Sequence, residues 1–246
     1  MNWDKWKGPL VLLIISVIFF LVVLTMGAGD LEIGDKQLFM VLNPSTNPTN
    51  PSLLDHFFVQ FSTWGPIDWG IATWGFIIFG VALFVLSIKI ERLRPMRFIL
   101  ILVIAGVLVG FLGLTTSLKH VIIRERPFMD GALLSNTNDW VSFFYPSSSA
   151  GELFDIGFES FPSGHATAAF VFATPFILVY KNYLIKVAAI IYGVLGAYAR
   201  VFLGVHYPID IFVGSLIGIL TVWVFYGVLK KVLVAKVSWF EYEESG

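Results

Sequence analysis

The chain contains no cysteine and few charged residues. Among its 246 residues there is no Cys, and Asp, Glu, Lys and Arg together make up 13%. The absence of cysteine excludes disulfide bonds and thiolate chemistry. The formal net charge is −1 and no block of Lys or Arg occurs, which excludes the electrostatic footprint of a protein that binds nucleic acid.

Apolar residues fill most of the sequence. Hydrophobic residues make up 57% of the chain and the mean hydropathy is +0.82, more apolar surface than one soluble core can bury. Six stretches without Asp, Glu, Lys or Arg approach the roughly 20 residues that cross the hydrocarbon of a bilayer. They are about 9–28, 69–88, 98–118, 166–180, 187–199 and 211–229, of which the fourth and fifth are short and need flanking residues.

These stretches are apolar on all sides, which favours membrane spans over the amphipathic helices of a soluble protein. We therefore predict an all-α membrane protein with six transmembrane helices in one domain, residues 1–246. The first stretch could also be a secretory signal with Gly27-Ala28-Gly29 at its cleavage site. Because it is longer than the usual signal core, we interpret it as a retained span.

The distribution of Lys and Arg predicts the orientation, since these residues concentrate on the cytoplasmic side. One side collects 11: Lys5, Lys7, Lys89, Arg92, Arg94, Arg97, Lys181, Lys186, Lys230, Lys231 and Lys236. The other has 5: Lys36, Lys119, Arg124, Arg126 and Arg200. Both termini are thus expected in the cytoplasm, most simply at the plasma membrane. The outer side holds long loops at about 29–68 and 119–164, with Asp30, Glu32 and Asp35 as solvated loop charges.

Three of the outer cations, Lys119, Arg126 and Arg200, lie at predicted helix ends. Lys119 and Arg126 are seven residues apart, so they share a face two turns apart if the third helix continues that far. Arg offers a planar fork of donors to phosphate oxygens and Lys a point charge, so the two could hold one anion. Arg124 could reach lipid headgroups or assist substrate binding, and we leave it out of the core of the site.

The segment Pro162-Ser163-Gly164-His165 comes directly before the fourth helix. The first N–H groups of a helix lack partners and its dipole favours a negative ligand. Gly164 lets the backbone approach such a ligand, and Ser163 can cap the helix or donate a hydrogen bond. A plain N-cap is the alternative, but the adjacent His165 favours an anion site.

The segment from Arg200 to Asp210 joins the fifth and sixth helices. Pro208 suits a first helical turn, which places Asp210 in that turn, about one turn beyond His206. The carboxylate could accept a proton from one ring nitrogen of His206 and leave the other free to attack phosphorus. Two histidines, only one of them beside a carboxylate, suggest a nucleophile and a general acid.

Together these segments resemble the three-part signature of the type 2 phosphatidic acid phosphatase superfamily. The parts are Lys119-(six residues)-Arg126-Pro127, Pro162-Ser163-Gly164-His165 and Arg200-(five residues)-His206-(three residues)-Asp210. They occur in order and on one predicted membrane face. One departure is Ala199, where the family often has Ser.

The resemblance implies an enzyme that removes phosphate from a membrane lipid, such as polyprenyl pyrophosphate, phosphatidylglycerol phosphate or phosphatidic acid, without metal ion or cofactor. It also implies a phosphohistidine intermediate, while the distribution of Lys and Arg predicts that the active site lies at the extracytoplasmic face. The implied catalytic residues are His206 as nucleophile, Asp210 as its partner and His165 as acid. The implied phosphate-binding residues are Lys119, Arg126, Ser163, Gly164 and Arg200.

Three alternatives stay open. The same site could transfer the phosphoryl group to another lipid or a sugar. A carrier for phosphorylated lipids would need broken helices and ionisable groups at mid-membrane depth, whereas the charges here stop at the helix ends. A vanadate-dependent haloperoxidase shares the signature, but those relatives are soluble. His56 and His120 are interpreted as structural, and Gly106, Gly110 and Gly113 as close-packing positions between helices.

Overall fold

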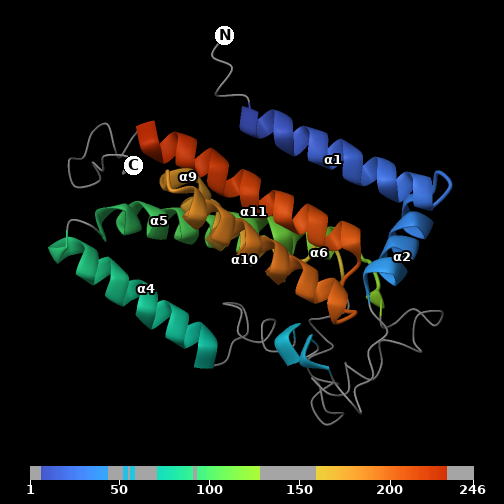
Figure 1. Cartoon of the computed structure of the whole chain (residues 1–246), viewed down its shortest axis with the longest axis horizontal. Helices are drawn as coiled ribbons and strands as arrows, with labels where there is room; N and C mark the ends of the chain where they lie inside the picture. The colour runs from blue at the N-terminus through green and yellow to red at the C-terminus, as the bar shows by residue number, and fades with distance from the viewer. Residues whose placement is uncertain are drawn as a thin grey trace. The chain divides into compact units, whose positions relative to one another are not determined.

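The computed structural model describes residues 7–43, 52–54, 56–58, 71–90, 93–127 and 159–231, and every long element in these ranges is a helix. The elements are α1 Lys7–Met26, α2 Leu31–Leu42, α4 Ile71–Lys89, α5 Arg94–Ala105, η3 Gly106–Thr115, α6 Thr116–Val121, α9 Gly164–Val179, α10 Tyr183–Phe202 and α11 Pro208–Leu229. Figure 1 shows their course. The prediction of an all-α chain is confirmed. The chain divides into two compact units, Met1–Pro44 and Ser45–Gly246.

The smaller unit consists of α1 and α2, whose axes differ by 94°. The Asp30 carboxylate caps α2 by accepting hydrogen bonds from the backbone N of Glu32 at 2.8 Å and of Ile33 at 3.1 Å. The predicted outer loop at 29–68 therefore begins with a helix. Asp30, Glu32 and Asp35 are the cap and the first turns of that helix, so the interpretation of them as loop charges was wrong.

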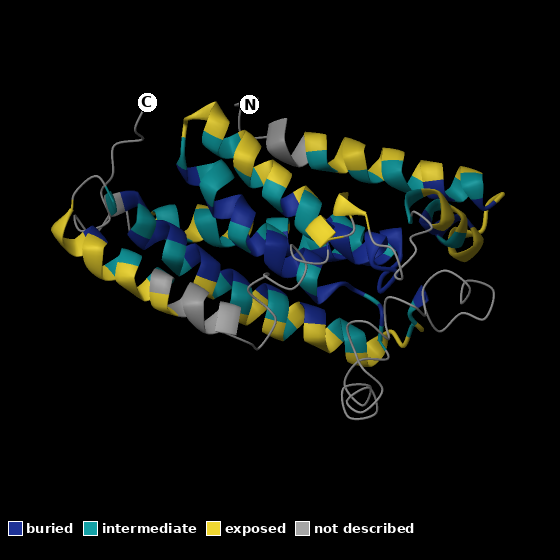
Figure 2. Cartoon of the chain, turned by 60° about the horizontal axis from the view of Figure 1, so that its bottom comes forward, coloured by how far each residue is buried: buried dark blue, intermediate teal, exposed yellow. Residues whose placement is uncertain are grey.

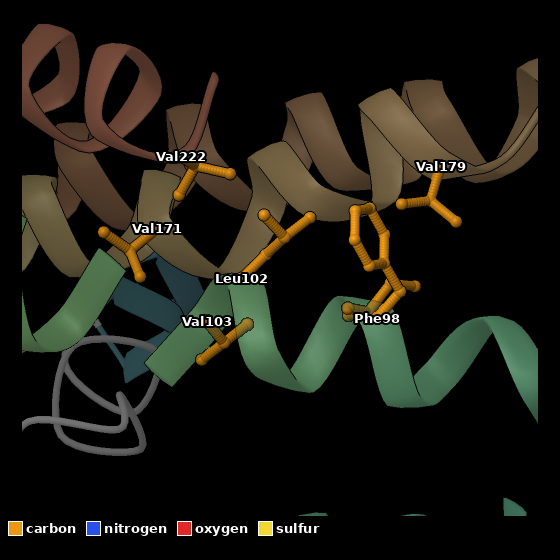
Figure 3. Close-up of a cluster of buried hydrophobic side chains, with 7 residues drawn as sticks. Phe98, Leu102, Val103, Val171, Val179 and Val222 are labelled. Atoms are coloured by element: carbon orange, nitrogen blue, oxygen red, sulfur yellow. The ribbon is translucent and has the colours of Figure 1, made fainter. Parts of the chain in front are cut away.

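The larger unit is built around α9, which contacts α5, η3, α10 and α11. In Figure 1 these helices lie side by side, and α4 packs against α5. Figure 3 shows the core where they meet, with side chains of α5, α9 and α11 pointing toward one another. The cluster includes Phe98, Leu102, Val103, Val171, Val179 and Val222.

Glycines allow α11 to approach α9 closely. A Cβ added to Gly214 would lie 2.4 Å from the carbonyl O of Ser163, and one added to Gly218 would lie 2.5 Å from the carbonyl O of Thr167. At Gly106, an added Cβ would lie 2.7 Å from Val171. Close packing between helices is thus confirmed at Gly106, and small residues fix the spacing of the helices that carry the second and third signature parts.

The third apolar stretch is one continuous helix through α5, η3 and α6, and its middle ten residues adopt a π-helix. Side chains bond the backbone five residues earlier in this part: Thr115 Oγ1 donates to Gly110 O at 2.9 Å, and Thr116 Oγ1 donates to Phe111 O at 3.2 Å. π-helical turns are rare and are often found near functional sites. The apolar pattern of the stretch did not distinguish this form from an ordinary α-helix.

Within the described residues, three helices are long and apolar enough to cross a membrane: Pro95–Val121, Tyr183–Phe202 and Pro208–Leu229. The bent pair of α1 and α2 would be a fourth if it forms one span. Helix α9 has 16 residues, while α10 extends the predicted stretch 187–199 at both ends, as expected. Figure 2 shows exposed residues on outward helix faces, and on α10 these include Ile190, Ile191 and Val194. Such apolar surface suits contact with lipid.

Candidate active site

The first signature part leaves the helix between its two cations. Helix α6 ends at Val121, and its C-cap Ile122 is extended, so Lys119 lies in the last turn and Arg126 beyond the helix. The expectation of a shared helix face was therefore wrong. Lys119 Nζ donates to the carbonyl O of Glu159 at 2.5 Å, and Arg126 Nη1 donates to the carbonyl O of Val205 at 3.4 Å. Arg126 thus contacts the third signature part, and Lys119 contacts the residue three positions before the second.

The second part forms the start of α9 as predicted. Ser163 is the N-cap, and its Oγ accepts a hydrogen bond from the N of Ala166 at 3.4 Å. Gly164 is buried, and a Cβ there would lie 2.9 Å from the ring of Phe111 on η3. The backbone N of Ser163 donates to the carbonyl O of Asp210 at 3.0 Å. The helix start that carries His165 is therefore bonded to the first turn of α11.

The third part is a tight turn between α10 and α11. The carbonyl O of Arg200 accepts hydrogen bonds from the N of Val205 at 3.1 Å and the N of His206 at 3.3 Å. Gly204 has φ 72°, the left-handed region in which glycine is favoured. Arg200 and His206 are both buried. Ala199 is buried in an apolar cluster rather than directed at a polar neighbour.

Asp210 lies in the first turn of α11, after Pro208 as predicted, and is fully buried. Its Oδ2 accepts a hydrogen bond from the N of Tyr207 at 2.8 Å. The same oxygen is 3.6 Å from Nδ1 of His206, which is longer than a hydrogen bond. The hydroxyl of Ser160 lies within hydrogen-bonding distance of Oδ2 and is 3.4 Å from Nδ1. The Ser160 hydroxyl therefore lies beside both the imidazole and the carboxylate.

Arg124 belongs to this site, contrary to the interpretation that left it outside. Its Nη1 donates to Oδ1 of Asp210 at 2.7 Å, and its Cζ lies 4.2 Å from the centroid of the Tyr207 ring. Its carbonyl O accepts a hydrogen bond from the N of Ser160 at 2.7 Å. Arg124 thus bonds both Ser160 and Asp210, the two residues beside the His206 ring.

Burial lowers the pKa of His206 well below its usual 6.5. The Asp210 carboxylate opposes this shift, while the Arg126 and Lys119 cations add to it. Removal from water disfavours the charged imidazolium, and burial is the largest of these effects. His206 is therefore neutral near pH 7, the state in which a ring nitrogen can act as a nucleophile.

Sequence reasoning missed Ser160 and misplaced Arg124. Arg124 was one of only five cations on the predicted outer side, and that scarcity could have drawn it into the site. Ser160 gave no such signal, because a single Ser in a polar loop is common. The remaining histidines differ: His120 Nδ1 is 3.8 Å from Glu159 Oε1, whereas His56 is exposed.

The protein has long apolar helices, and its candidate site combines a buried neutral histidine with a carboxylate and several cations. These features define a membrane-type helical protein with a site suited to a phosphoryl group. Family comparison agrees. The model of the PAP2 superfamily matches residues 94–233, more than half of the chain and all three signature parts. The chain belongs to this superfamily, and the resemblance to type 2 phosphatidic acid phosphatases is confirmed.

Several curated proteins are similar over part of their length. The lipid A 1-phosphatase of Rhizobium etli is 36% identical over 113 residues, 45% of this chain and 42% of that protein. The lipid A 4'-phosphatase of Bacteroides thetaiotaomicron is 32% identical over 71 residues, 29% of this chain and 32% of that protein. The putative undecaprenyl-diphosphatase YbjG of Escherichia coli is 29% identical over 124 residues, 49% of this chain and 52% of that protein. The matched region spans about a third to a half of these relatives.

The crystal structure of Aquifex aeolicus LpxE is similar over more of the chain. Its TM-score is 0.52 at 28% sequence identity, and the match covers 76% of this chain and 92% of that structure. The likeness therefore extends beyond the signature segments to most of the helices around them.

Proposed function

We propose that this protein is an integral membrane phosphatase that hydrolyses a lipid phosphate or pyrophosphate without a metal ion, through a phosphohistidine at His206. The observation that supports this most directly is a set of hydrogen bonds that links the signature parts and the residue Glu159 shortly before the second of them. Lys119 bonds Glu159, Arg126 bonds Val205, and Ser163 bonds Asp210. Three distant segments thereby meet around one buried imidazole.

In the proposal, the phosphate binds to cations and hydrogen-bond donors that come from all three signature parts. The binding groups are Lys119, Arg126, Arg200, the Ser163 hydroxyl and the Gly164 amide. Support comes from the position of Ser163 as N-cap, because free N–H groups at a helix start favour an anion. Arg124 is already paired with Asp210, so it is assigned no phosphate contact.

The reaction runs in two displacement steps. Nε2 of His206 attacks phosphorus, the bond from phosphorus to the leaving oxygen breaks, and His165 gives that oxygen its proton. In the second step His165 takes a proton from water, the water oxygen attacks phosphorus, and the bond to Nε2 breaks. Asp210 stabilises the positive charge that His206 carries between the two steps.

The proposed substrate is an amphiphile with a terminal phosphate. The relatives are named as lipid A phosphatases and a putative undecaprenyl-diphosphatase, and these names describe substrates of that kind. Polyprenyl pyrophosphate, phosphatidylglycerol phosphate, phosphatidic acid and lipid A form the panel to test. The proposal includes one domain with six spans in the plasma membrane, both termini in the cytoplasm and the site on the outer face.

Phosphate release from this panel by purified protein, with EDTA present, tests the function. We expect wild type to be active and His206→Ala and His165→Ala to lose activity, whereas the exposed His56→Ala serves as the matched control. A requirement for magnesium, or full activity of His206→Ala, would overturn the mechanism. Adding a lipid or sugar acceptor and analysing the products separates hydrolysis from phosphoryl transfer.

A further inference from the structure

We propose that Ser160 and Arg124 are positioning residues for the nucleophile, and that the Ser160 hydroxyl bridges His206 Nδ1 and the Asp210 carboxylate. The inference rests on the proposed function, since it assigns the nucleophile to His206. It differs from a simple histidine–carboxylate pair, in which the two side chains bond each other directly.

The distances favour a bridge over a direct bond. His206 Nδ1 is 3.6 Å from Asp210 Oδ2, while the Ser160 Oγ is 3.4 Å from Nδ1 and bonds the same carboxylate oxygen. A hydroxyl has one proton to donate and lone pairs to accept. Because an ionised carboxylate only accepts, the Ser160 proton goes to Asp210, and its lone pair is left for the N–H of His206. This arrangement places the imidazole proton on Nδ1 and leaves Nε2 free to attack.

Arg124 is hydrogen-bonded to both Ser160 and Asp210. Its carbonyl O accepts from the backbone N of Ser160 at 2.7 Å, and its guanidinium donates to Oδ1 of Asp210 at 2.7 Å. It also lies over the ring of Tyr207, whose backbone N donates to Oδ2 at 2.8 Å. Each oxygen of the buried carboxylate thus has a defined donor, so the carboxylate cannot turn away from the bridge without losing a charged hydrogen bond.

The segment of Ser160 is fixed from a second direction. Lys119 donates to the carbonyl O of Glu159, the residue before Ser160. The first signature part therefore bonds the carbonyl O of Glu159 and the backbone N of Ser160, which follow one another in the chain. Ser160 itself is fully buried. This placement explains how a loop residue can keep a defined position beside a catalytic imidazole.

The first test replaces the hydroxyl. Ser160→Ala is expected to lower kcat at least about tenfold with KM within about twofold, because substrate contacts remain while the imidazole loses its orientation. Ser160→Thr keeps a hydroxyl and should recover much of the loss. Ser215→Ala is the matched control, since its Oγ bonds only the carbonyl O of Ile211 on the same helix. Wild-type kcat in folded Ser160→Ala would overturn the bridge.

The second test removes a positive charge beside Asp210. Its result does not depend on whether Ser160→Ala folds. Arg124→Gln removes a cation beside the carboxylate, which then stabilises protonated His206 more strongly, so the acid limb of kcat/KM should move to higher pH. Arg124 acts through Asp210, whose pKa it lowers, while Asp210, Arg126 and Lys119 act on the pKa of His206 itself. Arg124→Lys should shift the limb less, and Lys186→Gln, at the other end of α10 from Arg200, should leave it unchanged. A lower rate with an unmoved limb would mean that Arg124 is only structural.

The proposed function and the Ser160 bridge can be disproved separately. If wild type releases phosphate and His206→Ala does not, while Ser160→Ala behaves as wild type, the bridge falls and the proposed function stands. If His206→Ala keeps full activity, the proposed function falls and the bridge falls with it. Folding of each variant is checked by a monodisperse elution profile and its Tm in the same detergent.

Discussion

The backbone N of Ser163 donates a hydrogen bond to the carbonyl O of Asp210 over 3.0 Å. This bond joins the N-cap of α9 to the first turn of α11, so the second and third signature parts share one fixed spacing. Gly214 lies one turn further along α11 and faces the carbonyl O of Ser163. The spacing of the two helices therefore depends on the absence of a side chain at position 214.

Gly214→Ala is expected to disturb the site without touching a proposed catalytic group. Its Cβ would lie 2.4 Å from the Ser163 carbonyl O, and a backbone atom cannot move aside as a side chain can. We expect kcat/KM to fall at least about tenfold and the protein to lose about 1–3 kcal/mol of stability, as in overpacked cores. Phosphate release and thermal unfolding in detergent measure both effects.

Gly227→Ala on the same helix is the control, because among the described residues no atom beyond the adjoining helix backbone lies within 4 Å of the added Cβ. It should be neutral or stabilise the helix by roughly 0.5–1 kcal/mol, since glycine costs more backbone entropy than alanine. Equal behaviour of the two variants would show that the contact between α9 and α11 does not set the geometry of the site.

Local features of the fold could be predicted from the sequence. Each apolar stretch coincides with a helix, because a run of apolar residues defines such a segment without reference to the rest of the chain. The cap at Ser163 and the turn from Pro208 to Asp210 were also predicted, since capping depends on residues within one turn. The meeting of the three signature parts followed from the family resemblance, not from periodicity.

Features that depend on contacts between distant segments could not be predicted. Helix α6 ends at Val121, and the chain that follows bonds the segment of Ser160, which lies 36 positions after Arg124 in the sequence. The pairing of Arg124 with Asp210 joins residues 86 positions apart. Helix α2 was missed for a local reason: Asp30, Glu32 and Asp35 were interpreted as loop charges, whereas Asp30 is a helix cap.

The pH dependence of activity follows from the lowered pKa of His206. Because burial keeps the imidazole neutral, the acid limb of kcat/KM for the free enzyme should lie below pH 6.5, after correction for ionisation of the substrate phosphate. A limb above pH 6.5 would contradict a buried nucleophile. The profile is measured with wild type across the acidic range, at fixed ionic strength.

The lowered pKa of His206 also makes the stability of the folded protein depend on pH. Below pH 6.5 the unfolded chain takes up a proton at His206 that the folded protein does not, so stability falls as the pH drops from 6.5 toward the folded pKa. Above pH 6.5 both states are neutral at this residue and the effect vanishes. Replacing His206 with Gln should make the Tm less sensitive to pH in that acidic window.

Phe58 supports the turn that carries Arg200 and His206. It is buried in a cluster with Ala199, Phe202, Leu203 and Val205, and its ring centroid lies 4.4 Å from that of Phe202. Phe58→Ala should cost about 3–5 kcal/mol, as for other buried aromatic residues, and lower activity through the turn. Phe57→Ala is the matched control, because Phe57 is 45% exposed. Similar Tm values for the two variants would contradict a supporting role for Phe58.

The absence of cysteine allows a direct test of topology. Leu53→Cys introduces a thiol in the first predicted outer loop, at a residue that is 90% exposed. Lys181→Cys introduces one in the turn between α9 and α10, where the residue is exposed. In sealed right-side-out vesicles a membrane-impermeant maleimide should label the first at once and the second only after permeabilisation. The reverse pattern would invert the proposed orientation.

The separate roles of the two histidines predict a dependence on the leaving group. In the proposed mechanism the alkoxide that leaves a lipid phosphate receives its proton from His165, so His165→Ala is expected to slow the first step about 10²–10⁴-fold. Nitrophenolate leaves without protonation, so p-nitrophenyl phosphate should still phosphorylate this variant.

Rapid mixing of His165→Ala with p-nitrophenyl phosphate should therefore give a burst of nitrophenolate and an acid-labile phosphoenzyme, because the second step still lacks its base. His206→Ala should give neither, because no bond from Nε2 to phosphorus can form. If His165→Ala were equally slow with both substrates, His165 would serve in binding rather than in protonating the leaving oxygen.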